Sequence, residues 1–370
     1  MEGVCVIKKL VIIAANTLCL IAFIICLSVS ASLRNPLRSQ QAISAWGGQS
    51  GDRFAQLSAF FPESSDFNED SIRGLNNSID KALLAASLES RPGRNLYTDA
   101  WSAAGIVSVL GERGSASAKA IGVGGDFFLF HPLYLRDGSY ILPGDIMKDR
   151  VVIDEELAWR LFGSVRLAGF EILINNLPFT IAGVVTREND SASQKAYADG
   201  AGLFMSFEAL SALTDGEAGI SCYEIVMPDP ITGFALAAIT EAFAGSNVHI
   251  VENSARFSLG NSFAAIVAFG ERSMQKDAIA FPYWENAARY VEDWLALLLL
   301  LALIFIVFPI ICGVYYSVRI IRFLYRQGKK AVKKAVKQYD DRKYEKYMLE
   351  HYEDSGDYDV DDIIREVKES

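Results

Sequence analysis

Residues 294–318 read Trp294-Leu-Ala-Leu-Leu-Leu-Leu-Leu-Ala-Leu-Ile-Phe-Ile-Val-Phe-Pro-Ile-Ile-Cys-Gly-Val-Tyr-Tyr-Ser-Val318, a run that contains no charged side chain. A second uncharged run, Leu10–Leu33, lies near the start of the chain. A transmembrane α-helix needs about 20 predominantly apolar residues, so either run is long enough to cross a membrane. The sequence therefore predicts two transmembrane helices, over residues 10–33 and 294–318, with a globular segment between them.

Lys and Arg near the helix ends predict the orientation, because these residues concentrate on the cytoplasmic side. The first run has cations on both flanks, but the second is followed by eight cations without an acidic residue among them. Residues 1–9 and 319–370 are therefore expected in the cytoplasm, and residues 34–293 outside a plasma or inner cell membrane that the chain crosses twice. The eight cations are Arg319, Arg322, Arg326, Lys329, Lys330, Lys333, Lys334 and Lys337.

A cleaved signal peptide is the alternative interpretation of the N-terminus. Val29 and Ala31 fit the small-residue cleavage rule, and Lys8 and Lys9 would form the basic region before the apolar run. The run is longer than the 7–15 residues typical of a signal peptide, which favours a membrane helix.

The outer segment has an acidic composition and one cysteine. Residues 34–293 contain 20 Lys and Arg against 32 Asp and Glu, which argues against nucleic acid as a partner. Cys222 is the only cysteine between the two apolar runs, so no disulfide within this segment is expected, and a buried thiol is its expected state.

The start of the outer segment predicts a β-α unit. Phe54–Phe61 is expected to be a strand, and Asp66 or Asn68 is expected to cap the helix that follows. That helix has apolar residues at helical spacing, namely Ile72, Leu75, Ile79, Leu83 and Leu84.

The end of the segment predicts a β-α-β unit, made of strand Tyr223–Met227, a helix over residues 231–244 and strand Asn247–Val251. The two units enclose a β-rich insert at about residues 97–203. The expected fold class is α+β, a two-lobed extracytoplasmic domain in which the βα and βαβ units form one lobe and the insert forms the other.

Within the insert, turn signals separate short apolar runs. Gly105–Leu110 and Ala116–Val123 are expected to form one hairpin, and residues 171–175 and 179–185 a second around Asn176-Leu-Pro178. Between them, Val151–Ile153 is expected to be a strand, after which Asp154 caps a helix that ends at Gly163.

The insert also resembles a known family. Ala120-Ile-Gly-Val-Gly-Gly-Asp-Phe-Phe128 is followed by Asp149-Arg-Val-Val-Ile-Asp-Glu-Glu-Leu-Ala-Trp-Arg-Leu-Phe-Gly163 and then by Asn175-Asn-Leu-Pro-Phe-Thr-Ile-Ala-Gly-Val-Val185. This order resembles the MacB-like periplasmic core domain of MacB-like and FtsX-type ABC transporter permeases. The resemblance is close over residues 115–186 and covers the rest of the outer segment in general layout.

The resemblance implies a non-catalytic permease component whose outer domain binds a partner or substrate and relays motion driven by a separate cytoplasmic ATPase. Such permeases usually have two further membrane helices, so this sequence looks like a half-length component. Its expected partners are the ATPase subunit, another permease subunit and membrane lipids, in an oligomeric complex. A membrane-anchored sensory or adaptor protein with the same outer domain is the alternative, and a membrane-bound hydrolase is a third hypothesis.

The residues favour no catalytic, cofactor or metal site. His131, His249 and His351 lack metal-ligand spacing, and a surface or packed position is expected for each. Asp154-Glu-Glu156 is explained by the preference for acids at a helix N-terminus. The sequence contains no P-loop, G-x-S-x-G or H-E-x-x-H motif.

Two sets of residues are candidates for contacts with partners. An aromatic cluster is expected either to form core or to present an apolar surface to a partner or lipid-like substrate: Phe127, Phe128, Phe130, Tyr134 and Tyr140. The second set is expected to contact other helices or the membrane surface: Asn16, Thr17, Pro309, Gly313, Arg319, Arg322, Lys329 and Lys330.

The tail changes from basic to acidic. Its basic part, residues 319–337, is expected to continue as a helix near anionic headgroups. Residues 357–367 have the apolar spacing of a short acidic amphipathic helix, which would either be solvated or dock on a cytoplasmic partner.

Overall fold

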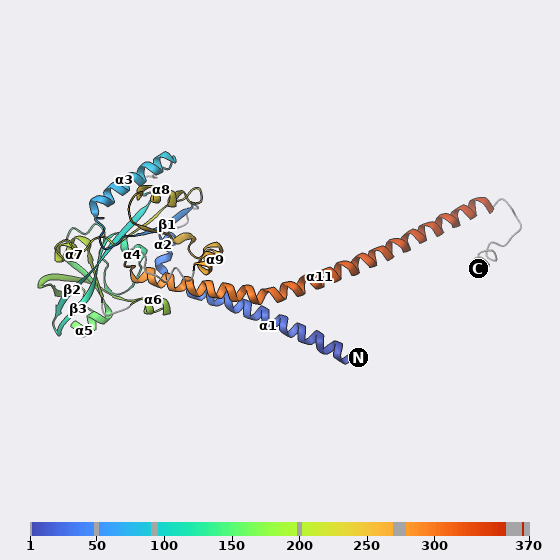
Figure 1. Cartoon of the computed structure of the whole chain (residues 1–370), viewed down its shortest axis with the longest axis horizontal. Coiled ribbons are helices and arrows are strands. Elements are labelled where there is room, and N and C mark those ends of the chain that lie inside the picture. Colours follow the sequence, from blue (N-terminus) through green and yellow to red (C-terminus); the bar gives the residue numbers. More distant parts are fainter. Residues whose placement is uncertain are drawn as a thin grey trace. The chain divides into compact units, whose positions relative to one another are not determined.

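The computed structural model describes residues 2–47, 52–89, 95–197, 202–268 and 279–352, together with Arg365. The chain divides into two compact units (Figure 1). Residues 23–302 form one unit, which contains the sheet. The other consists of residues 1–22 and 303–370, and so contains most of helix α1 (Glu2–Arg34) and most of helix α11 (Tyr283–Tyr352).

The strands that the structure describes form a single mixed sheet in the order β10-β1-β9-β2-β3-β8-β5-β7-β4, and β6 pairs with both β2 and β7. The β3–β8 and β5–β7 pairs are parallel, and the other pairs are antiparallel. The bounds are β1 Phe54–Phe60, β2 Thr98–Gly111, β3 Gly114–Gly125, β4 Tyr134–Gly138, β5 Arg150–Asp154, β6 Glu171–Ile174, β7 Leu177–Thr186, β8 Gly202–Ser206, β9 Cys222–Pro228 and β10 His249–Glu252.

Short helices cover the sheet. In Figure 1, α3 and α8 lie together at one end of it, where contacts join them. The bounds are α2 Ala42–Gly47, α3 Glu69–Ala85, α4 Phe127–Phe130, α5 Glu155–Leu161, α6 Ser191–Ala196, α7 Phe207–Leu213, α8 Phe234–Ala242 and α9 Leu259–Val267, with 3-10 turns η1 Arg38–Gln40 and η2 Asn253–Ala255.

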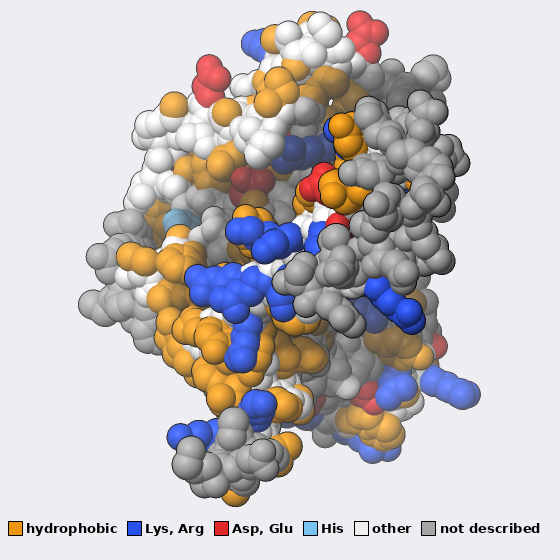
Figure 2. Space-filling model, turned by 90° about the vertical axis from the view of Figure 1, so that its right-hand side faces the viewer, with side chains coloured by type: hydrophobic (Ala, Val, Ile, Leu, Met, Phe, Trp, Pro, Cys, Tyr) orange, Lys and Arg blue, Asp and Glu red, His pale blue; other side chains and the backbone are white. Residues whose placement is uncertain are grey.

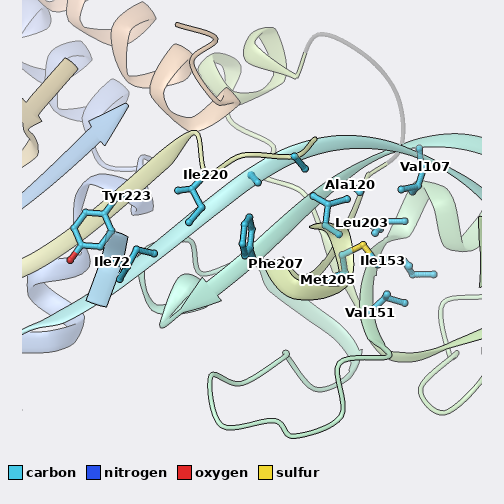
Figure 3. Packing of buried hydrophobic residues seen from close by; sticks show 14 of the residues in the cluster. Ile72, Val107, Ala120, Val151, Ile153, Leu203, Met205, Phe207, Ile220 and Tyr223 are labelled. Carbon is cyan, nitrogen blue, oxygen red and sulfur yellow. The ribbon is translucent and has the colours of Figure 1, made fainter. Parts of the chain in front are cut away.

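The sheet is buried on both faces, because alternate residues of its strands enter two different apolar clusters. Val151 and Ile153 of β5 belong to the larger cluster, whereas Val152 between them belongs to the second. Figure 3 shows part of the larger cluster, in which Phe207 of α7 lies among strand residues. The second cluster contains α4 and Trp284 of α11.

A third cluster lies where α1 ends and α11 begins. Its buried members are Leu37, Ala192, Ala287, Ala288, Val291 and Leu295. Leu33 of α1 and Phe257 pack against it. The outer domain and the outward ends of both apolar helices therefore share one packed region.

The predicted β-α unit is confirmed. Asn68 is the N-cap of α3, where its side chain accepts a hydrogen bond from the Ser71 backbone N–H. The apolar stripe is buried except at Leu84, which is exposed. Asp154 likewise caps α5, and Gly163 follows its end with a φ of 70°.

Some predicted boundaries are wrong. The turn of the second hairpin is Asn175-Asn176, with φ values of 47° and 65°, and Leu177 and Pro178 already belong to β7. Two consecutive residues with positive φ suit a two-residue hairpin turn. The strand and helix near the end of the segment are β10 and α8, which differ from the predicted ranges by up to three residues.

Both predicted membrane segments are helical. The apolar windows lie within helical stretches Ile7–Arg34 and Tyr283–Leu349, which are long and apolar enough to cross a membrane. The face in Figure 2 carries broad areas of hydrophobic side chains with clusters of Lys and Arg. The basic part of the tail continues α11 as predicted, whereas the predicted acidic helix, residues 357–367, lies outside the described residues except for Arg365.

We predict that Gly125→Ala destabilises the protein more than Gly245→Ala. Both glycines have positive φ, 61° and 84°, so alanine is strained at either position by about 1–2 kcal/mol. A Cβ at Gly125 would also lie 2.3 Å from the Asp99 carbonyl oxygen, whereas nothing lies within 4 Å of one at Gly245. Overpacking adds about 1–3 kcal/mol at Gly125 alone. Urea unfolding of the detergent-solubilised protein measures both losses, and equal losses would contradict the prediction.

Candidate functional site

The predicted aromatic cluster is largely core. Phe127 and Phe130 are buried, and the half-buried ring of Phe128 stacks on Tyr140 with centroids 4.5 Å apart. Tyr134 is separate and exposed, with the Arg136 guanidinium 5.7 Å from its ring centroid. The structure therefore brings four of the five residues together, and only Phe128, Tyr140 and Tyr134 have accessible surface to offer a partner.

The predicted helix contacts lie on α1 and α11. Thr17 is exposed, and the half-buried Asn16 has a side-chain oxygen without a hydrogen-bond partner. Pro309 and Gly313 lie inside α11, which continues through both. An amide oxygen without a partner in an apolar helix is suited to a hydrogen bond from another helix, so that contact stays a prediction.

The predicted basic contacts with the membrane surface are all available. Arg319, Arg322, Lys329 and Lys330 lie on α11 and are exposed. Their contact with headgroups stays a prediction.

Asp154 is explained by local structure. One of its oxygens accepts the cap bond from the Leu157 N–H at 2.7 Å, and the other accepts from the Gly202 N–H at 2.6 Å and pairs with Arg187. Burial raises the pKa of Asp154 above its usual value, although Arg187 acts in the opposite direction. In the described part of the chain, no group of three or more His, Cys, Asp and Glu is placed to hold a metal ion.

A buried polar network crosses the sheet instead. It consists of His131, Glu224, Ser58, Asn253, Arg256, Glu285 and Glu292, and is called the buried network below. The first six residues are at most 5 % exposed. They come from the end of α4, from β9, β1 and η2, from the loop after η2, and from the start of α11, so the network connects segments that are far apart in sequence.

A chain of hydrogen bonds runs through the network from Arg256 to Glu224, and each residue donates to the next. Arg256 Nη1 donates to Asn253 Oδ1 at 3.4 Å, and Asn253 Nδ2 donates to Ser58 Oγ at 2.7 Å. Ser58 Oγ donates to Glu224 Oε1 at 3.0 Å, and the other oxygen of Glu224 contacts His131 Nε2. His131 Nδ1 is buried without a hydrogen-bond partner. The bonds named above are each strong because water is excluded, so they restrict movement of the residues that they join.

Arg256 attaches the network to α11. Its Nη1 and Nη2 each donate to a different oxygen of Glu285 at 2.6 Å, and its Nε donates to Glu292 at 2.7 Å. Glu285 and Glu292 are seven residues apart and therefore lie on the same face of the helix, two turns from each other. Burial alone would lower the pKa of the Arg256 guanidinium, but the two carboxylates raise it above its usual range.

The other end of the network also meets α11. The ring centroids of His131 and Trp284 are 4.2 Å apart, and those of His131 and Phe127 are 4.5 Å apart. Trp284 and Glu285 are neighbours in sequence, so consecutive residues of α11 reach the two ends of the network. The start of α11 is thus held to the sheet at two points.

Cys222 lies beside this network and is buried, as predicted for a thiol without a partner. Burial raises the pKa of the Cys222 thiol well above its usual value, and the carboxylates of Glu224 and Glu285 raise it further. The thiol is therefore unreactive.

A cavity of about 440 Å³ lies on the sheet beside the start of α11. Its walls include Ile121 and Phe204 from the sheet and Tyr283 and Trp284 from α11, with Lys119 among the polar lining residues. The lining is mostly apolar but also contains charged side chains, among them Asp154 and Arg187. A cavity of this size with both kinds of lining could hold a small ligand.

The sequence matches a known protein family. The MacB-like periplasmic core domain model matches residues 10–276. The chain belongs to this family. Among solved structures, the periplasmic region of MacB from Actinobacillus actinomycetemcomitans is 17 % identical, with 54 % of this chain and 88 % of that chain covered and a TM-score of 0.38. The extracellular domain of the noncanonic ABC-type transporter YknZ from Gram-positive bacteria is 15 % identical, with 54 % and 100 % covered and a TM-score of 0.36. No curated protein matches this sequence significantly.

The sequence motifs of the MacB-like domain do not contain most of the buried network. The recognisable stretch, residues 120–185, supplies β3 to β7 and, from the network, only His131. From the sequence alone, no role was assigned to Arg256, Glu285 or Glu292. A signal was available, because two acids seven residues apart just before an apolar run lie on one helix face and require a partner if that face is buried.

We predict that Arg256→Met lowers the free energy of unfolding of the MacB-like domain by about 3–5 kcal/mol, because it leaves Glu285 buried without its partner. Glu285→Gln and Glu292→Gln in the same variant should restore part of the loss. The measurement is urea unfolding of the detergent-solubilised protein.

The matched control is Arg73→Met, which removes a cation paired with Asp70 on the exposed surface of α3. Exposed pairs contribute little, so this variant should unfold at nearly the parental urea concentration. An Arg256→Met effect no larger than that of the control would refute the structural importance of the buried network.

Proposed function

We propose that this chain is the non-catalytic permease component of an ABC-type membrane complex, and that its outer domain binds a partner or substrate and relays motion driven by a separate cytoplasmic ATPase. The observation that carries the proposal is the attachment of the sheet to α11 through Arg256 in a chain of the MacB-like family. Family membership supports the ATPase partner.

The relay follows from the cost of separating buried charges. Pulling Arg256 away from Glu285 would leave two ions in an apolar environment, which costs several kcal/mol. The sheet and the start of α11 therefore move together, and α11 continues as one helix to Tyr352. A displacement of the helix on the cytoplasmic side would reach the outer domain without passing through a flexible linker.

Binding of a partner or substrate is supported by the surface of the outer domain. The cavity beside Tyr283 is lined partly by α11, so an occupant would contact both the sheet and the helix that moves with it. The half-buried rings of Phe128 and Tyr140 offer a second apolar surface, and the exposed ring of Tyr134 lies apart from it. No chemical step is assigned to either place.

The proposed orientation places the outer domain outside the cell membrane and both termini in the cytoplasm, and both apolar helices cross. The support is the basic segment after Val318, which is exposed along α11.

An accessibility experiment tests this orientation. In intact cells, Ile146→Cys should react with an impermeant maleimide, because Ile146 is 94 % exposed on the outer domain. Lys334→Cys should react only after permeabilisation, and the parent gives the background, in which buried Cys222 is unreactive. Labelling of Lys334→Cys in intact cells would overturn the orientation.

The ATPase partner is tested by purification of the intact protein from its native membrane in mild detergent. We expect an ABC ATPase to co-purify, and we expect deletion of residues 338–370 to weaken this association, because that acidic segment would lie on the cytoplasmic side together with the ATPase. Arg256→Met is the control, since it alters the outer side only and should retain the ATPase.

The sensory or adaptor alternative gives the opposite result. A chain that purifies without an ATPase at every detergent strength would refute the permease proposal and favour that alternative. Loss of the ATPase from Arg256→Met but not from the tail deletion would place the contact elsewhere.

A further inference from the structure

We propose that α9 is an interfacial helix that lies on the outer surface of the membrane, with Leu259, Phe263 and Val267 inserted at the boundary of headgroups and acyl chains. The inference goes beyond transport or force transmission, and it rests on the proposal that α1 and α11 cross the membrane.

The first observation is an exposed apolar stripe on α9. Leu259, Phe263 and Val267 are 76 %, 55 % and 83 % exposed. They are four residues apart, so they lie along one face of the helix. On the opposite face, Ala265 is buried and 7 % exposed. The side chains that a soluble helix would bury are thus the ones that α9 presents outward.

The second observation is the position of α9 relative to the membrane helices. Phe257, two residues before α9, packs in the cluster that includes Leu33 and Leu295. Leu33 is the last residue of the first apolar run, and Leu295 is the second residue of the other. The chain therefore enters α9 from the place where both helices leave the membrane.

The contacts of Arg256 in the buried network also place the start of α9 close to the outer end of the apolar run. Arg256 binds Glu292, which is two residues before the apolar run, or about 3 Å along the helix axis. Leu259 follows Arg256 by three residues, so it lies at most about 11 Å from it along the chain. Such a distance allows the start of α9 to lie within the interfacial region, whose headgroups add several ångströms to each side of the hydrocarbon core.

The structure of α9 is set before any lipid is bound. Ser258 caps its N-terminus by accepting from the Asn261 N–H at 3.3 Å, and Asn261 Nδ2 donates to the Ala255 carbonyl at 2.8 Å. The helix therefore does not have to fold on the membrane. Ile24 on α1 and Leu297 on α11 are also exposed apolar side chains, and they belong to the same unit of the protein as α9.

The chemistry of α9 commits the proposal to lipid as the occupant. Leu259–Val267 contains no charged residue, so attraction to a charged partner surface does not contribute. Insertion of apolar side chains would hold the helix, and it requires no anionic headgroup. A second copy or another protein covering the stripe is the competing outcome.

Photo-crosslinking in nanodiscs tests the proposal with the full-length protein. In separate variants, p-benzoylphenylalanine replaces Leu259, Phe263 or Val267, and mass spectrometry identifies the adduct after illumination. We expect lipid adducts at all three positions, with equal yield in phosphatidylcholine and in mixtures with phosphatidylglycerol. An adduct that requires the anionic lipid would refute insertion as the force that holds α9.

Two control positions make the result decisive. Leu84 on α3 is 67 % exposed and lies on another helix of the outer domain, so it should give no lipid adduct. Ile24 on α1 is 59 % exposed within the first apolar run and should give one. Lipid adducts at Ile24 but not on α9 would refute the interfacial helix alone, as would protein adducts at Phe263. No adduct at Ile24 would refute the membrane crossing and the interfacial helix with it.

Discussion

The ion pair between Arg256 and the two carboxylates of α11 is the constraint on which the outer domain depends. A buried guanidinium has to be neutralised and hydrogen-bonded, and here Glu285 satisfies it in a bidentate manner while Glu292 binds its third nitrogen. Since these acids lie just before the apolar run, the same bonds determine where the sheet stands relative to the outer end of that run. The cluster around Val291 packs beside them, so the charge and the apolar contacts fix one arrangement together.

The buried ion pair determines how α11 is positioned on the domain more than it adds to the free energy of folding. Apolar residues of similar volume could hold the helix against the domain equally well, because desolvation of the ions offsets much of their attraction. They would, however, permit α11 to rotate about its axis or slide by a turn. Arg256 opposes both movements, since rotation would carry Glu285 and Glu292 away from the guanidinium together, and a slide by one turn would move both carboxylates about 5 Å along the axis.

The sequence predicted those elements whose signals are local. The N-cap at Asn68, the cap at Asp154 and the apolar stripe from Ile72 to Leu83 are each determined within a few residues, and the structure has all of them. No helix was predicted near residue 190, but the structure has α6 there, because Ala192 packs in the third cluster. The buried network joins residues up to 195 positions apart, as between Ser58 and Asn253, and no spacing rule indicates such a contact. Only the seven-residue spacing of Glu285 and Glu292 was visible beforehand.

After β10 the outer domain has a buried polar network followed by a helix with an exposed apolar face, in contrast to the apolar clusters of its middle. The middle is a sheet covered on both faces by two apolar clusters within the domain. After β10 the chain instead passes through Asn253 and Arg256, which are bound from both sides, and then enters a helix with an unpaired apolar face. A rigid polar anchor followed by an exposed apolar helix is a reasonable arrangement only beside a second apolar phase. The charged anchor sets the depth of the domain above the membrane, and the helix next to it would oppose tilting, because tilting would withdraw Leu259, Phe263 and Val267 from the lipid.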